Sequence, residues 1–102
     1  MKPINVVTSA GIKSLVPKKR FSHLGFDFAI VEKPEWYLNS TEPMYLKRVI
    51  EVKTGMEIPV YNLQRKDTLK SIMDKTIDLL DSFVDRGANL MHEISQYETI
   101  NP

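Results

Sequence analysis

The sequence predicts an α+β fold in which a small antiparallel sheet of three or four strands packs against one long C-terminal amphipathic helix. Three observations carry this prediction: alternation of apolar residues from His23, a hairpin pattern over residues 46–61, and helical apolar spacing over residues 67–97. The chain has 102 residues, of which 42% are hydrophobic and 26% charged. This length and composition are typical of a single globular domain.

Residues 1–20 are predicted to form a basic N-terminal segment. Residues 1–26 carry five Lys and Arg side chains and no acid, and three of the cations are consecutive: Lys18, Lys19 and Arg20. Such a run can contact nucleic-acid phosphates. No helix-turn-helix, zinc-finger or RNA-recognition signature accompanies it. The alternative is a solvated segment, or one that docks on acidic side chains.

The strands are predicted within residues 23–61. Leu24, Phe26, Phe28 and Ile30 alternate with less apolar positions, which indicates a strand with one strongly apolar face. Pro34 is expected to end this strand, and residues 32–44 then form a long loop that holds Trp36 and Tyr37. Long loops inside compact domains are often functional. These two aromatic residues either cover a sheet edge or are offered to a partner.

Residues 46–61 are predicted to form a hairpin with a three-residue loop at Lys53-Thr54-Gly55. With Gly55 in the left-handed conformation, this loop places Val52 opposite Met56 and gathers the apolar residues on one face. Glu51 then lies opposite Glu57 on the outer face. Pro59 lacks an N–H for strand pairing, so the last strand is expected at a sheet edge.

A helix is predicted over residues 67–97, capped by Asp67 or Thr68. Its apolar seam is Leu69, Met73, Thr76, Leu80, Phe83, Gly87, Leu90, Ile94 and Tyr97. In one interpretation the helix ends at Arg86, Gly87 terminates it, and a short second helix folds back. The seam keeps its phase across Gly87, which favours the other interpretation, a continuous helix about 46 Å long. Its overhang would then pair with a second copy through Leu90, Met91, Ile94 and Tyr97.

Four acids, Asp74, Asp78, Asp81 and Asp85, lie on one face of the predicted helix. Adjacent like charges at this spacing cost about 0.2–0.5 kcal/mol per pair. The face is either a solvated back surface or a docking surface for a cationic segment. That segment would belong to a basic protein partner or to residues 18–20 of this chain.

Glu51-x-Lys53 on one strand, with Asp27 on another, resembles the core of the PD-(D/E)XK nuclease family. The resemblance implies Mg²⁺ held by the two carboxylates and a Lys that stabilises developing charge. It covers three residues. Phe26 stands where the family often has proline, no acid precedes Asp27, and a strand rather than a helix follows Gly55. The alternative is ordinary solvated strand charges.

The chain has no cysteine, which excludes disulfides and thiolate metal sites, and it has no signal-peptide pattern or membrane-length apolar run. A cytoplasmic protein is therefore expected, without membrane association, cofactor or metal. The sequence favours a non-enzymatic protein-interaction or regulatory module that forms a homodimer through its C-terminal helix. A small metal-dependent nuclease or a weak nucleic-acid binder is the alternative.

Overall fold

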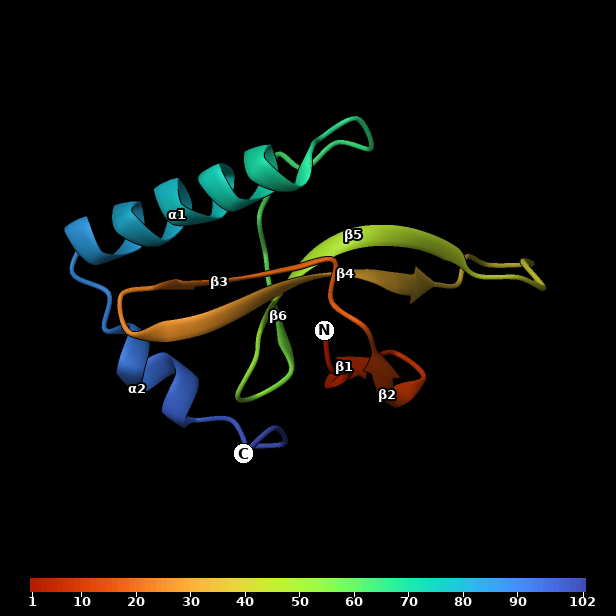
Figure 1. Cartoon of the computed structure of the whole chain (residues 1–102), viewed down its shortest axis with the longest axis horizontal. Coiled ribbons are helices and arrows are strands. Elements are labelled where there is room, and N and C mark those ends of the chain that lie inside the picture. The colour runs from red at the N-terminus through yellow and green to blue at the C-terminus, as the bar shows by residue number, and fades with distance from the viewer.

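A computed structural model describes residues 1–102 and confirms the α+β class (Figure 1). Six antiparallel strands form two sheets, and the larger sheet has the strand order β3-β4-β5-β6. The strands and helices are β1 (Ile4–Thr8), β2 (Gly11–Leu15), β3 (Lys19–His23), β4 (Phe26–Glu35), β5 (Met44–Glu51), β6 (Met56–Ile58), α1 (Leu69–Asp85) and α2 (Leu90–Ser95). Neither helix has both the length and the apolarity of a membrane span.

The four-stranded sheet is covered on both faces, which the sequence analysis did not foresee. On one face Phe28, Ile30 and Val49 pack against Ile72 and Leu80 of α1. On the other face a second cluster joins the sheet to the β1–β2 hairpin: Ile4, Val6, Ala29, Val31, Ile50 and Val52. Figure 1 shows the sheet between α1 and this hairpin. Because both faces are buried, β4 carries an unbroken apolar run rather than a simple alternation.

The basic N-terminal segment forms the β1–β2 hairpin. Ile4, Val6 and Thr8 alternate with exposed or half-buried residues, and this face of β1 is buried against the sheet. Val6 is fully buried, so the hairpin belongs to the core. The strand alternation in INVVT is the signal that the composition-based description of residues 1–20 overlooked.

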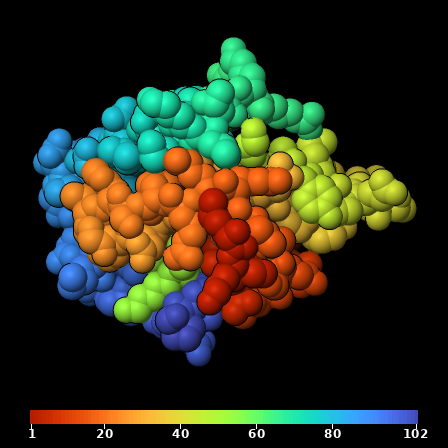
Figure 2. Space-filling view, in the orientation of Figure 1, coloured from red at the N-terminus to blue at the C-terminus, as the bar shows by residue number.

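Two expectations for the β4–β5 connection are wrong. β4 continues through Pro34 to Glu35, and the loop covers residues 36–43 rather than 32–44. Pro34 is tolerated because β3 pairs with β4 only up to Ile30, so the strand has β5 alone as its neighbour at Pro34. The long hairpin consequently extends beyond the rest of the molecule, as Figure 2 shows for the yellow segment.

The β5–β6 register also differs from the prediction by one residue. Glu51 lies opposite Met56, and Ile50 lies opposite Glu57, so the loop runs from Val52 to Gly55. Gly55 has the predicted left-handed backbone, with φ +68°. Glu51 is only 2% exposed. Its carboxylate accepts hydrogen bonds from the backbone N–H of Lys53 at 2.9 Å and of Thr54 at 3.0 Å, which satisfies the buried acid within the turn. β6 is an edge strand, as Pro59 predicted.

The prediction of a continuous C-terminal helix is wrong. Thr68 caps α1, as expected, by accepting a hydrogen bond from Ser71 N–H at 3.1 Å. The helix ends before Gly87, whose φ is +91°. The N–H groups of Gly87 and Ala88 donate to the carbonyls of Val84 and Phe83, each at 2.9 Å. This is the Schellman arrangement, and it turns the chain back toward the sheet.

The helix break removes the predicted overhang. α1 spans about 26 Å, which matches the sheet that it covers. Its buried residues are Ile72, Thr76 and Leu80, of which Thr76 and Leu80 belong to the predicted seam. Met73 and Phe83, also in that seam, are half-buried. In α2, Leu90 packs on the same cluster as α1. The chain thus returns to its own core.

Candidate functional site

The predicted nuclease residues line one hollow but do not form an open carboxylate pair. Asp27, Glu51 and Lys53 border a hollow of about 910 Å³ between the start of β4, the 52–55 turn and the C-terminal tail. Asp27 accepts a hydrogen bond from Ser22 Oγ at 2.6 Å, and both oxygens of Glu51 are engaged in the turn. No three acids or histidines gather as a metal-binding group. The geometry gives Glu51 a structural role in shaping the loop.

The four acids of α1 have different surroundings. Asp74 pairs with Lys70 at 3.0 Å within the helix. Asp81 Oδ1 lies 2.6 Å from Nε2 of His23, which ties α1 to the end of β3. Asp78 and Asp85 are exposed and form no ion pair. One member of the predicted acidic face therefore fastens the helix to the sheet, and two remain free.

The basic residues 18–20 do not dock on the acidic helix face. Lys18 lies 4.0 Å from Glu32 of β4, its only carboxylate neighbour. Lys19 and Arg20 belong to β3 and form no ion pair. Arg20 points to the hollow that also borders Lys53. Lys19 and Arg20 are successive residues of β3, so their side chains point to opposite faces of the sheet.

The four C-terminal residues predicted to bind a partner are partly used by the fold itself. Leu90 and Ile94 are half-buried, while Met91 is 72% and Tyr97 51% exposed. Met91 borders a shallow, largely apolar hollow together with Leu24 and Val84, which are also exposed. An apolar surface therefore remains at this end of the molecule, although it is much smaller than a helical overhang.

The aromatic loop is the most prominent exposed apolar feature. Five large apolar side chains lie at the tip of the β4–β5 hairpin with exposures from 37% to 94%: Trp36, Tyr37, Leu38, Met44 and Tyr45. We call these five residues the aromatic tip. Asn39 adopts φ +67° within the turn, a conformation that asparagine tolerates better than most residues. Trp36 is 44% and Tyr37 55% exposed, so both rings present part of their surface to solvent.

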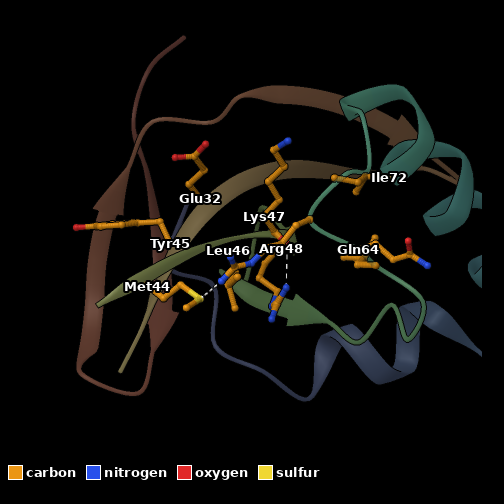
Figure 3. Close-up of a pocket in the computed structure, with 10 residues that line it drawn as sticks. Glu32, Met44, Tyr45, Leu46, Lys47, Arg48, Gln64 and Ile72 are labelled. Atoms are coloured by element: carbon orange, nitrogen blue, oxygen red, sulfur yellow. Dashed lines mark hydrogen bonds between the residues drawn. The ribbon is translucent and has the colours of Figure 1, made fainter. Parts of the chain in front are cut away.

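A pocket of about 410 Å³ lies beside the aromatic tip, along the outer edge of β5 (Figure 3). One wall is β5 itself, from Met44 to Arg48, and the opposite wall is the segment Leu63–Arg65. Three cations, Lys47, Arg48 and Arg65, line the pocket with a single acid, Glu32. Figure 3 shows Glu32 and Lys47 on one side of the strand and Arg48 on the other. We call this the β5-edge pocket.

One carboxylate beside the β5-edge pocket has an altered acidity. Asp67 accepts a hydrogen bond from Gln64 N–H at 2.6 Å, and its oxygens lie 3.0 Å from Nζ of Lys75. The backbone bond to Gln64 contributes most, followed by Lys75, and together they lower the pKa of Asp67 from 3.8 to about 2. Because Asp67 holds the turn that follows Leu63–Arg65, it fixes one wall of the pocket.

The β5-edge pocket was not predicted from the sequence. Two signals were available: Tyr45, Lys47 and Arg48 form a polar and aromatic stretch in a long strand, and Pro59 shortens the strand that follows. A short β6 leaves part of β5 without a neighbour. Comparison with family models, with curated proteins and with solved structures gives no match to this chain.

Proposed function

We propose that this protein is a non-enzymatic protein-interaction module and that the aromatic tip is its main contact surface. The observation that carries the proposal is the gathering of five exposed large apolar side chains at one protruding end of the hairpin. Tyr, Trp and Met are enriched in protein interfaces, and the Tyr and Trp rings supply a large contact area with few rotatable bonds. Scattered exposed apolar residues need no explanation, whereas a contiguous group favours a binding role.

The location of the aromatic tip supports the same proposal. The tip lies beyond both core clusters, none of whose members belongs to residues 36–45. Its side chains are therefore not needed to complete the core. Cations of the β5-edge pocket lie next to it, so an apolar contact surface adjoins a charged one. This combination is typical of an interface with an apolar centre and a polar rim.

The test is affinity capture with quantitative mass spectrometry, using the whole protein as bait. We expect partners that are retained by the unaltered chain and lost with Trp36→Ser/Tyr37→Ser/Leu38→Ser. The matched control is Ile12→Ser/Val16→Ser. It also removes exposed apolar side chains, but outside the aromatic tip: Ile12 lies in β2 and Val16 directly follows that strand. Equal capture by all three baits would contradict the proposal. Trp36 is the only tryptophan, so its fluorescence reports directly on contact at the tip.

A homodimer through the C-terminal region is the second candidate. It is supported by the exposed Leu24, Val84 and Met91, which border one apolar hollow at the junction of α1 and α2. Light scattering behind a sizing column would give twice the chain mass for a dimer, and Met91→Glu would return it to one chain mass. A single chain mass for the unaltered protein at high concentration would exclude this candidate.

A further inference from the structure

Part of β5 has an unpaired backbone edge that faces the β5-edge pocket. β6 pairs with β5 only over Val49–Glu51, whereas β5 begins at Met44. Residues 44–48 therefore have β4 on one side and no strand on the other. An uncovered strand edge is a ready template for another extended chain.

The direction of the free backbone groups follows from two hydrogen bonds. The carbonyl of Glu51 accepts from Gly55 N–H at 2.9 Å on the β6 side, and Val52 N–H donates to Asp27 of β4 at 2.9 Å. In an antiparallel strand the N–H and C=O of one residue point the same way, and successive residues alternate. Lys47 and Tyr45 thus share the side of Glu51 and turn their backbone groups toward the pocket.

Most of these edge groups have no partner within the chain. The carbonyl of Lys47 accepts a bond from the guanidinium of Arg48 at 3.0 Å. The N–H groups of Tyr45 and Lys47 and the carbonyl of Tyr45 take part in no loop or side-chain hydrogen bond. Two donors and one acceptor are consequently available at the spacing that an added strand requires.

The charges around this edge favour an acidic occupant. Arg65 donates to the thioether sulfur of Met44, and Lys47 Nζ donates to the backbone carbonyl of Asp67 at 3.3 Å. Sulfur is a weak acceptor, so a carboxylate would be a stronger partner for Arg65. Glu32, the one acid in the lining, already lies 4.0 Å from Lys18.

We propose that the β5-edge pocket binds an extended acidic peptide segment of a partner protein, which adds to the sheet as a strand beside Met44–Arg48. The added strand pairs with Tyr45 and Lys47, its carboxylates contact Lys47 and Arg65, and Tyr45 covers its end. The proposal rests on the proposed function as an interaction module and names the chemistry of the partner.

Two other occupants fit these observations less well. A second copy paired edge to edge would bring Lys47, Arg48 and Arg65 of both copies into one interface, where like charges repel. A single-stranded nucleic acid would satisfy the cations and stack on Tyr45. It would not pair regularly with the alternating N–H and C=O groups of a strand edge, so the peptide accounts for more of the site.

The experiment uses a fluorescent peptide of about eight residues in which Glu-Glu and Val-Val pairs alternate, so that carboxylates lie on both faces of the added strand and can reach both Lys47 and Arg65. Three comparison probes are the same peptide with Lys in place of Glu, the acidic peptide with alternate backbone nitrogens methylated, and an oligothymidine of similar length. Fluorescence anisotropy is measured with the whole protein, at low and at high salt.

We expect the acidic peptide to bind and the Lys peptide not to bind. N-methylation removes the strand hydrogen bonds without changing charge and should weaken binding by about tenfold. Lys47→Glu/Arg65→Glu should weaken it by about tenfold or more. Lys2→Glu/Lys13→Glu makes the same change of charge elsewhere and should leave it nearly unchanged. If charge reversal unfolds the protein, as near-ultraviolet circular dichroism would report, Lys47→Gln/Arg65→Gln replaces it.

Several results would overturn the inference. Equal binding of the methylated peptide would show that charge alone attracts it, and tighter binding of oligothymidine would assign the pocket to nucleic acid. If the unaltered protein dimerises and Lys47→Glu/Arg65→Glu changes that dimerisation, the strand edge binds a second copy instead. If no peptide binds while capture still depends on Trp36, Tyr37 and Leu38, this inference fails and the proposed function stands. Capture that does not depend on them contradicts the function instead.

Discussion

The inner and outer halves of the β4–β5 hairpin are made by the same two strands in opposite surroundings. In the inner half, Phe28–Ile30 pairs with Val49–Glu51, β3 and β6 lie on either side, and every one of these residues is 0–2% exposed. In the outer half, Glu32–Glu35 pairs with Met44–Lys47 and has no strand on either side. There Tyr45 is 60% exposed.

This difference separates stability from recognition along one ribbon. The inner half contributes to both core clusters, so its side chains stabilise the fold. The outer half contributes to neither, and its exposed side chains and backbone edge are available to a partner. Since the two halves share a backbone, the rigid inner half holds the outer half in position. Substitutions in the inner half should therefore lower the stability of the fold, whereas substitutions in the outer half should weaken binding and leave stability nearly unchanged.

The largest expected effect is that of Phe28→Ala. Phe28 is 1% exposed and stacks on Phe21 with ring centroids 5.4 Å apart, so its loss leaves a cavity beneath α1. Truncation of a buried Phe costs about 3–5 kcal/mol, whereas Tyr45→Ala in the outer half should change the free energy of unfolding by less than about 0.5 kcal/mol. Urea unfolding of both variants measures the contrast. Similar costs at the two positions would show that the halves are not separate.

The next effect concerns Gly55, which ends the turn after the inner half and lies against Ile100 of the C-terminal tail. A Cβ there would collide with the side chain of Ile100 and lie 2.7 Å from the carbonyl oxygen of Asn5. Gly87 has the same left-handed backbone and an open surrounding. Gly87→Ala should cost about 1–2 kcal/mol from backbone strain. Gly55→Ala should cost about 1–3 kcal/mol more because of the added overpacking. If urea unfolding gives the same loss of unfolding free energy for Gly55→Ala and Gly87→Ala, the C-terminal tail moves aside from the added Cβ without a measurable cost.

The fold class, the sheet with its C-terminal helix, the Thr68 cap and the left-handed Gly55 could all be predicted, because each depends on residues close in sequence. The helix break could not. The apolar phase continues across Gly87 since Leu90 returns to the same core as Leu80, and spacing alone does not distinguish this return from contact with a second molecule. Only the three-dimensional path of residues 86–89 does.

The hairpin register failed for a related reason. The prediction put Glu51 on the solvent face, because the three-residue loop gathers the apolar residues of the hairpin on the other face. Its partners are backbone N–H groups of its own turn, which a hydrophobic pattern does not reveal. At the candidate site, Trp36 and Tyr37 could be predicted from the loop alone. The β5-edge pocket could not, because Leu63–Arg65 come beside β5 only through the path that the chain takes after β6.

A third effect tests the structural role of Glu51 at the end of the inner half. Glu51→Ala leaves the N–H groups of Lys53 and Thr54 without acceptors, and Thr54 is only 3% exposed. The expected cost is about 1–3 kcal/mol in the free energy of unfolding. Glu42→Ala in the exposed loop is the control and should change it by less than about 0.5 kcal/mol. The nuclease interpretation would be favoured instead by a different result. In that case the unaltered protein cleaves DNA with Mg²⁺, and Glu51→Ala loses this cleavage while its stability is unchanged.

The smallest expected effect is a change of stability with pH between about pH 4 and about pH 2, and it concerns Asp67 at the flank of the outer half. The folded pKa of Asp67 is about 2, below its ordinary value of 3.8, because the Gln64 N–H and Lys75 favour the charged form. A lowered folded pKa contributes stability above the unfolded value, and this contribution disappears as pH falls from about 4 to about 2. The difference in melting temperature between the unaltered protein and Asp67→Asn should therefore narrow across that window.

Asp78→Asn is the matched control for Asp67→Asn, since Asp78 is exposed and forms no ion pair. Its melting temperature should follow that of the unaltered protein over the whole pH range. Because Asp67 fixes the wall of the β5-edge pocket, the acidic peptide should also bind Asp67→Asn more weakly than Asp78→Asn at neutral pH. A melting difference for Asp67→Asn that is constant from about pH 6 to about pH 2 would show that this carboxylate does not hold the turn, and the outer half would then need another support.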